Sequence, residues 1–321
     1  MCLQPGQMSM NRVIWLAAMS LAMVTVSSNA AEYGSSTKDS DGLQSVQSTP
    51  KESPLLPKKP QFRYSYDLSW VHDDNIRRAQ NVVDIRADSL LNLTLTAKAG
   101  KTLSRYSLLS YGGSISAENF SQFKELNNLK FGVNVKYRFA NASRFTSPMY
   151  SLGFKMGGIE SNKVMRDSTL YSINLGVNKW LTNTINMSLG LVHKERESRS
   201  SVFDTKENLV FGNLDINLSK STLLYTTYSY IAGDTVSSAT PTLAIINAAE
   251  AIEVDDAFGG ITTNQFAYRL DSDTQVLTLG YNTVIVAATS IDFSYRYVKT
   301  ESKGSIEYDR SIFRLSLLGR F

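Results

Sequence analysis

The chain has 321 residues, a formal net charge of +4 at pH 7 and a mean hydropathy of −0.17. It contains no run of 18 apolar residues, so the sequence predicts no transmembrane helix. The slight positive charge does not indicate a nucleic-acid partner. With two histidines, one cysteine and no phosphate-binding loop, the chain is expected to hold no metal and no cofactor.

Residues 1–30 have the features of a secretory signal peptide. Arg12 supplies a positive charge, residues 13–26 form an apolar stretch too short to cross a bilayer, and cleavage is expected after Ala30. An N-terminal core helix is the alternative, but the stretch lacks an amphipathic period. Cys2, the only cysteine, would be removed with this segment, so the exported chain would form no disulfide.

Residues 31–60 are rich in Ser, Thr, Lys and Asp and contain four prolines in their second half. A segment of this composition cannot bury enough apolar surface to fold alone, which predicts a disordered periplasmic arm. Residues 61–321 form the remaining domain.

In this domain apolar and polar residues alternate, which is typical of β-strands. In residues 129–139, for example, Leu129, Phe131 and Val133 alternate with Lys130 and Gly132. Twelve such segments are expected, near 62–70, 84–98, 105–117, 129–139, 150–156, 171–177, 185–191, 210–218, 223–231, 264–283, 291–297 and 313–321. Twelve is an even number, as bacterial single-chain membrane barrels require, although ten or fourteen strands remain alternatives.

The connections are expected to alternate in length, with short joins at the periplasmic end. The long ones, expected outside the cell, lie near 72–83, 118–128, 160–168, 195–206, 232–262 and 299–308. A soluble β-sandwich also alternates. Against it stand the 16 Tyr, 14 Phe and 3 Trp residues, of which Trp70 and Trp180 fall at strand ends, where membrane barrels carry aromatic girdles. The fold class predicted is an all-β transmembrane antiparallel up-and-down barrel.

The last strand ends on an aromatic residue, Phe321. An alternating final strand with a terminal Phe resembles the assembly signal of Gram-negative outer-membrane β-barrel proteins. This resemblance implies location in the outer membrane, contact with its lipid, and recognition of Phe321 by the barrel-assembly machinery.

If the apolar faces contact lipid, the alternate residues line the lumen. The basic residues assigned there are Arg63, Lys130, Lys136, Arg138, Lys155, Arg296, Arg314 and Arg320, opposed by Asp67, Asp215 and Asp292. A basic lining with low-dielectric walls concentrates anions. Inert filling of the lumen by paired charges is the alternative interpretation.

The segment 232–262 is the longest loop. Thr240-Pro241 can open a helix, apolar residues follow from Leu243 to Ile252, and Gly259-Gly260 end the segment. This helix is expected to fold into the mouth as a constriction or lid, to pack on neighbouring loops, or to meet a partner. The constriction would carry Glu250, Glu253, Asp255 and Asp256 toward the basic wall.

The segment Trp70–Arg78 has the arrangement Trp-x-x-Asp-Asp-Asn-Ile-x-Arg. It resembles the first hairpin of porin-like barrels associated with exopolysaccharide export. The run Asp73-Asp74-Asn75 offers oxygen ligands for Ca²⁺, but a solvated turn is the preferred interpretation.

The leading function predicted is an outer-membrane channel for small anionic or sugar-like solutes, with a link to polysaccharide export. The first alternative is a non-conducting structural or adhesive barrel whose outer loops bind partners. The second is a rim-type hydrolase, but His72 and His193 belong to the first and seventh strands and would lie on opposite sides of a twelve-stranded barrel. No catalytic residue is therefore assigned.

Overall fold

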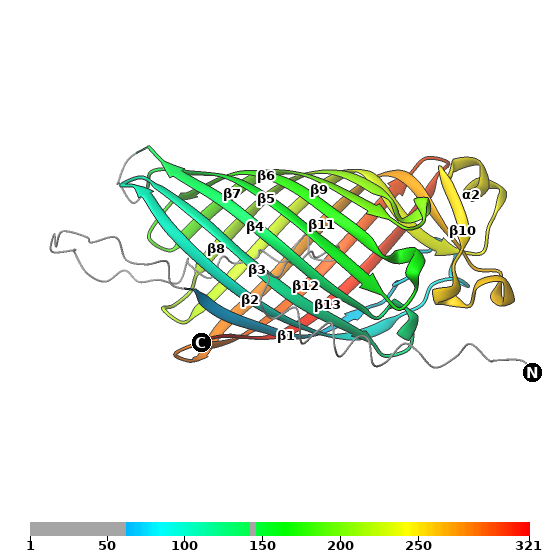
Figure 1. The fold of residues 1–321 in the computed structure, drawn as a ribbon, viewed down its shortest axis with the longest axis horizontal. Coiled ribbons are helices and arrows are strands. Elements are labelled where there is room, and N and C mark those ends of the chain that lie inside the picture. The colour runs from blue at the N-terminus through cyan, green and yellow to red at the C-terminus, as the bar shows by residue number, and fades with distance from the viewer. Residues whose placement is uncertain (1–61, 142–145) are drawn as a thin grey trace, which may run out of the picture.

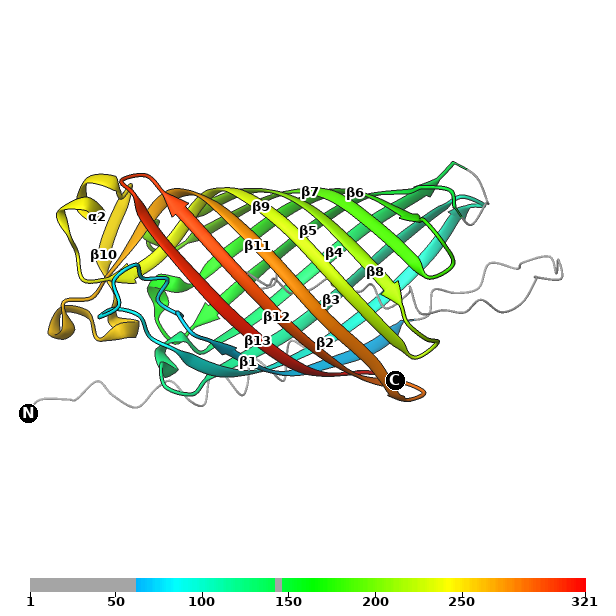
Figure 2. The same ribbon diagram turned by 180° about the vertical axis from the view of Figure 1, so that it is seen from behind.

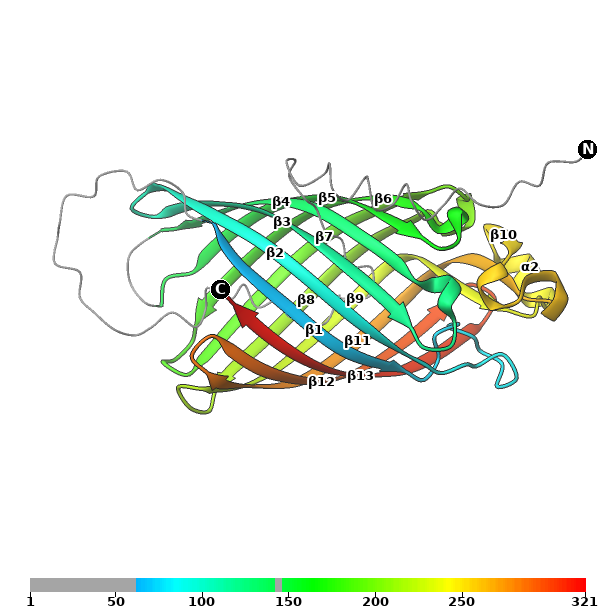
Figure 3. The ribbon, with the colours of Figure 1, turned by 60° about the horizontal axis from the view of Figure 1, so that its bottom comes forward.

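The computed structural model describes residues 62–141 and 146–321, so the expected signal peptide (1–30) and arm (31–60) lie outside the described residues. Twelve antiparallel strands form a closed barrel (Figure 1). Consecutive strands pair, β9 pairs with β11, and β13 pairs with β1, so the barrel has no open edge. Figure 3 shows β13 beside β1 at this closure. The prediction of an all-β up-and-down barrel with twelve strands is confirmed.

The barrel strands differ in length, and the longest form the β9–β11 hairpin. Their bounds are β1 Arg63–Asp73, β2 Asp88–Ser104, β3 Ser107–Phe120, β4 Asn128–Ala140, β5 Met149–Ser161, β6 Ser168–Trp180, β7 Ile185–Ser198, β8 Thr205–Asn217, β9 Thr222–Ala239, β11 Phe266–Val286, β12 Thr289–Ser302 and β13 Ile306–Arg320. A short thirteenth strand, β10 (Ala251–Val254), pairs only with the outer end of β11.

The two faces of the barrel wall differ sharply in polarity. Leu68 and Trp70 point outward and are 45% and 44% exposed, whereas Ser69 between them is 1% exposed and faces the lumen. The same alternation runs around the wall, because directly paired residues of neighbouring strands share a face. An apolar exterior around a polar interior is the arrangement of a barrel whose solvent is lipid.

The strands extend further than the apolar alternation suggested, and the loops are correspondingly shorter. The segments 195–206 and 299–308 were expected as long loops, but strands take up half of the first and most of the second, and only 199–204 and 303–305 lie outside them. Beyond the apolar band the ladder continues with polar outward residues, such as Lys299 and Glu301, whose Nζ and Oε1 are 2.5 Å apart. Backbone groups pair across a sheet in water as they do in lipid, so the end of the apolar pattern does not mark the end of a strand.

The outer connections are named here L1 (74–87), L2 (121–127), L3 (162–167), L4 (199–204), L5 (240–265) and L6 (303–305). Only L1 and L5 are long, so the expected difference between outer loops and inner turns is smaller than predicted. The inner connections are 105–106, 141–148, 181–184, 218–221 and 287–288. The C-terminus lies at the end of the barrel opposite to α2 and β10 (Figures 1 and 2).

Two further expectations about local structure were wrong. The helix expected through Ile252 is one short helix, α2 (Leu243–Ala248), capped by the Thr242 side chain, which accepts from the Ile245 N–H at 3.3 Å. The rest of that apolar run pairs with β11 as β10, which satisfies its backbone groups. Trp180 lies opposite the buried Asn186 and so falls on the lumen face, leaving only Trp70 of the two on the lipid face.

The outer loops also contain five 3₁₀ turns: η3 Lys124–Leu126, η4 Val164–Arg166, η5 Ser201–Phe203, η6 Asp256–Phe258 and η7 Gly260–Thr263. In the described part of the chain, no helix is long and apolar enough to cross a membrane.

Candidate functional site

The lumen wall carries the eight basic residues that the sequence assigned to it. Lys130, in the outer half of β4, is 3% exposed and forms an ion pair with Glu118 of β3. Arg314 of β13 donates to Asp67 of β1 at 2.6 Å. Arg63, Lys136, Arg138, Lys155, Arg296 and Arg320 have the same inward register.

These cations are unevenly distributed around the lumen. The basic wall, as we call it, consists of residues in the inner halves of β13, β1, β2, β4 and β5: Arg63, Lys98, Lys136, Arg138, Lys155 and Arg320. The inner halves of β6 to β8 carry mainly amides and hydroxyls on the lumen face, together with one acid, Asp215. There Asn178 donates to Asn186 at 2.5 Å and to Ser188 at 2.8 Å. One side of the inner lumen therefore presents cations and the facing side presents amides and hydroxyls.

Sequence reasoning missed several charged lumen residues. Lys98 was not assigned, and Asp73, Glu118, Lys194, Arg196, Glu207 and Arg310 fall in segments that had been assigned to the outer loops or left outside the assigned strands. Three of these acids form ion pairs with a basic residue on the neighbouring strand: Asp73 with Arg310, Glu118 with Lys130, and Glu207 with Lys194. These residues could have been found by continuing each strand beyond its last apolar residue, because every second residue still faces the lumen there.

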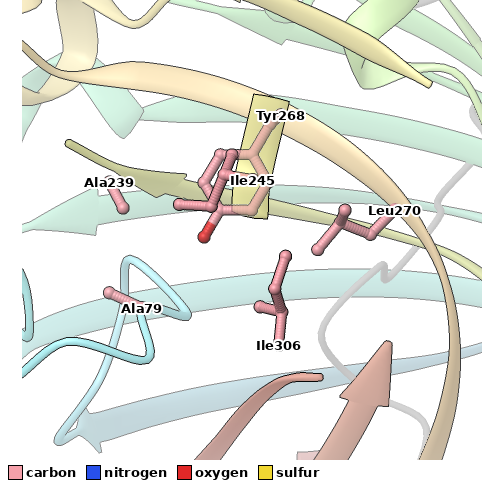
Figure 4. Close-up of a cluster of buried hydrophobic side chains, with 6 residues drawn as sticks. All are labelled: Ala79, Ala239, Ile245, Tyr268, Leu270 and Ile306. Atoms are coloured by element: carbon pink, nitrogen blue, oxygen red, sulfur yellow. The ribbon is translucent and has the colours of Figure 1, made fainter. Parts of the chain in front are cut away.

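The outer end of the lumen is covered by L1 and by the tip of the β9–β11 hairpin. On one side of this tip, Ala239, Tyr268 and Leu270 pack with Ala79 of L1 and Ile306 of β13, and Ile245 of α2 joins them (Figure 4). Each of these six residues is at most 5% exposed.

The other side of the hairpin tip is also buried. Ala267, at 0% exposure, packs against Val202 and Phe203 of L4 and Met165 of L3. A two-stranded tip that is buried on both faces, between L1 and L3–L4, must lie across the mouth rather than stand upright at its rim.

L5 continues from this tip across the mouth. The ring of Phe258 in η6 lies 4.8 Å from the ring of Phe123 in L2. L2 connects β3 and β4, whereas L5 connects β9 and β11, which are on the opposite side of the barrel. The guanidinium of Arg77 in L1 lies 4.9 Å from the Phe258 ring centre and 5.7 Å from that of Phe123, which is the geometry of a cation–π contact.

L1 also forms hydrogen bonds with the end of β9 and the start of L5. The Arg77 carbonyl accepts from the Ser238 N–H of β9 at 2.8 Å, and Asp84 accepts from the Thr240 hydroxyl at 3.0 Å. We call the assembly of L1, L5 and the β9–β11 tip the cap. In the described residues it contacts every other outer loop, including L6, where the Gln80 side chain donates to the Ser305 carbonyl at 3.3 Å.

The four acids predicted to form a constriction occupy different positions in the cap. Asp255 is fully buried, accepts from Arg166 of L3 at 2.7 Å and also bonds the Ser238 hydroxyl. Glu250 is exposed and lies 3.4 Å from Arg269, Glu253 bonds Ser200, and Asp256 is exposed. Asp255 thus anchors the cap, while the constriction role of the four acids stays a prediction.

The Asp73-Asp74-Asn75 run forms a structured turn. Asp73 pairs with Arg310, Asp74 accepts from the Ser311 N–H at 2.8 Å, and the Asn75 amide donates to the Ala79 carbonyl at 2.9 Å. The two aspartates thus bond β13 while Asn75 bonds within L1, so their oxygen atoms do not converge on one point. In residues 62–141 and 146–321, no group of three His, Cys, Asp or Glu side chains is placed to hold a metal ion.

The two histidines lie on the outward face of β1 and β7, six strands apart. His72 stacks on Trp70 and its Nδ1 is 2.9 Å from the Ser89 hydroxyl. His193 Nδ1 is 2.9 Å from Asn208 Oδ1. The opposite placement predicted from the chain order is confirmed, and the two imidazoles cannot act on one substrate.

The terminal residue is held against the first strand. Phe321 donates its N–H to the Tyr64 carbonyl at 3.1 Å, and its ring stacks on that of Tyr64 with centroids 5.9 Å apart. The ring is 76% exposed on the outer surface of the barrel. Its role as an assembly signal stays a prediction.

No protein-family model matches the chain. No curated protein matches it either. Among solved structures, the chain is similar to an outer-membrane channel from Pseudomonas putida F1, with a TM-score of 0.52 and 8% identity over 86% of this chain and all of that one. It also matches the KdgM porin in complex with disordered oligogalacturonate, with a TM-score of 0.39 and 11% identity over 80% of this chain and 99% of that one. At these identities the similarity to the channel shows the fold alone: with the apolar exterior, it makes the chain an outer-membrane β-barrel.

Proposed function

We propose that this protein is an outer-membrane channel for small anionic or saccharide solutes. The observation that carries the proposal is the one-sided lumen, in which the basic wall faces the amides and hydroxyls of β6 to β8. Cations on a wall of low dielectric constant raise the local concentration of anions, and amides and hydroxyls can hydrogen-bond sugar hydroxyl groups. A solute carrying both carboxylates and hydroxyls finds partners on both sides.

The cap would act as a lid that sets the bore. It joins opposite walls through Phe123 and Phe258 and is fixed by the buried ion pair of Asp255 and Arg166. Passage of a solute larger than an ion therefore requires L5 to leave L2. The resemblance of Trp70–Arg78 to export-associated barrels supports a link to polysaccharide export, and an acidic saccharide is the solute that suits both sides of the lumen.

Liposome swelling with three hexose derivatives of similar size tests this function. Glucuronate should enter vesicles that contain the barrel faster than glucose, and glucose faster than protonated glucosamine. Equal rates for glucuronate and glucosamine would refute the role assigned to the basic wall. No entry of any of the three, either through the unaltered barrel or through Phe258→Ala, in which the contact between L5 and L2 is weakened, would refute the channel.

A second candidate is a non-conducting barrel whose outer loops bind a partner. The observation that favours it is the closed cap with exposed apolar side chains on its surface, among them Leu243 at 78% and Ile261 at 78%. No swelling, combined with binding to a partner that is lost when L5 is exchanged, would favour this candidate. The rim-hydrolase alternative gains no support from the positions of His72 and His193.

A further inference from the structure

A group of charged side chains lies at the outer end of the lumen, next to the cap. It comprises the three ion pairs between neighbouring strands, Asp73–Arg310, Glu118–Lys130 and Glu207–Lys194. Two further arginines belong to it, Arg78 of L1 and Arg196 of β7. In each of the three ion pairs, one carboxylate balances one cation. The two arginines are left as the excess charge.

Arg78 is held in this position by an unusual backbone conformation. Its φ is +58°, in the left-handed region that residues with a Cβ rarely adopt. The neighbouring Arg77 contacts Phe258 of L5, whereas Arg78 bonds the Val236 carbonyl of β9. The turn at Arg78 therefore directs two consecutive arginines toward different elements. Strained backbone conformations of this kind are enriched at functional positions.

The guanidinium of Arg78 bonds a backbone carbonyl rather than a carboxylate. Its Nη1 donates to the Val236 carbonyl at 3.3 Å, and in the described part of the chain no carboxylate lies within ion-pair distance of it. Its pKa is lowered first by burial and then by the charge of Arg310, while Tyr308, Asp73 and Glu207 act in the opposite direction. These neighbours belong to β13, β1 and β8, so the Arg78 charge lies among lumen side chains from separate walls.

Arg196 is the second such residue. Its Nε donates to the Ser168 hydroxyl at 3.0 Å and its Nη2 to the Arg166 carbonyl at 3.0 Å. Over residues 62–141 and 146–321, it too forms no ion pair. Arg166 and, after it, Arg78 are the cations that act on Arg196, and Glu207 acts on both Arg196 and Arg78. Arg78 and Arg196 are thus two half-buried guanidinium groups of like charge at the outer end of the barrel, and neither forms an ion pair within the described residues.

We propose that Arg78 and Arg196 form an anion-binding site next to the cap, which takes the carboxylate or phosphate group of a small solute. Both groups hold planar N–H donors, and guanidinium binds such oxyanions in a bidentate manner. An anion between them removes their mutual repulsion and supplies the missing counter-charge. This inference rests on the proposed channel function and adds to it: the site would bind a solute at the outer end of the lumen, next to the cap.

Isothermal titration of the detergent-solubilised barrel with inorganic phosphate at low salt tests the site. One saturable site is expected, and chloride should compete for it. Arg78→Ala and Arg196→Ala should each weaken phosphate binding by about tenfold, the factor that follows from loss of one charge-assisted hydrogen bond. Arg78→Lys retains the charge and should bind more tightly than Arg78→Ala.

Arg86→Ala is the matched control, because Arg86 lies in the same loop, is exposed, and bonds only the Val83 and Ile85 carbonyls in the described structure. It should bind phosphate like the unaltered protein. No saturable binding, or equal weakening by Arg86→Ala and Arg78→Ala, would overturn the site. Glucuronate entry without phosphate binding would refute only the site, and phosphate binding without glucuronate entry would refute only the channel.

Discussion

Phe258 and Phe123 touch edge to face, with centroids 4.8 Å apart and an interplanar angle of 69°, although their loops arise from opposite walls of the barrel. L5 must extend over the lumen to make this contact, so in the proposed channel the contact would hold the cap closed. In that proposed channel, closure would depend on a small number of side chains.

The first prediction concerns this aromatic contact. Phe258 is 5% exposed, and replacing a buried Phe by Ala costs about 3–5 kcal/mol in a packed core. Phe258→Ala should therefore loosen L5 and raise the rate of glucuronate entry into liposomes several-fold. Leu243→Ala, on exposed α2 of the same loop, should leave the rate unchanged. Equal rates in the two variants would show that the contact does not limit passage.

The second prediction concerns the buried ion pair that anchors L5. Asp255→Asn removes the carboxylate that neutralises Arg166, and breaking a buried pair in this way costs about 3–5 kcal/mol. Amide hydrogen exchange in residues 255–265 should then accelerate by at least tenfold. Asp256→Asn, one residue away on the exposed side, should not change it. Unaltered exchange in Asp255→Asn would mean that apolar packing alone holds the cap.

The third prediction concerns the basic wall. Lys136→Ala combined with Arg138→Ala removes two inward cations from β4, so the chloride-to-potassium permeability ratio should fall several-fold through loss of electrostatic focusing. Lys179→Ala combined with Lys220→Ala removes the same net charge from exposed positions, an outward strand residue and an inner turn. An equal fall in both double variants would assign the effect to overall charge.

The fourth prediction concerns the two faces of the wall. Leu93 of β2 is 44% exposed on the apolar surface, and arginine on the lipid face near mid-membrane costs about 2–4 kcal/mol. Leu93→Arg should lower the free energy of unfolding in lipid vesicles by this amount. Thr94→Arg, the next residue on the lumen side, should lower it much less. The reverse order would show that the faces are assigned the wrong way round.

Much of the wall could be predicted from the sequence, because period-2 alternation is a local property. Leu129 to Phe139 show it directly, and twelve such segments give the strand number. Strand ends could not be predicted, since pairing beyond the lipid, as between Lys299 and its neighbours, leaves no apolar pattern. Trp180 was placed by its type at a strand end, whereas its parity puts it on the lumen side.

The cap could be predicted only in part. The apolar content of L5 indicated that it must bury itself somewhere, and it does. Its partners could not be read from the chain, because Phe123 and Arg77 lie more than a hundred residues away from Phe258 and become neighbours only when the barrel closes. The proposed role of Arg78 could not be predicted from the sequence, because it depends on a left-handed backbone conformation and on charged residues of three strands.

The central claim is that the lumen conducts and prefers anions. The reversal potential of the unaltered barrel in a planar bilayer, with KCl at different concentrations on the two sides, tests it most directly. We expect measurable single-channel currents and a reversal potential with the sign of chloride selectivity. Potassium selectivity, or no current in either the unaltered barrel or Phe258→Ala, would contradict the claim.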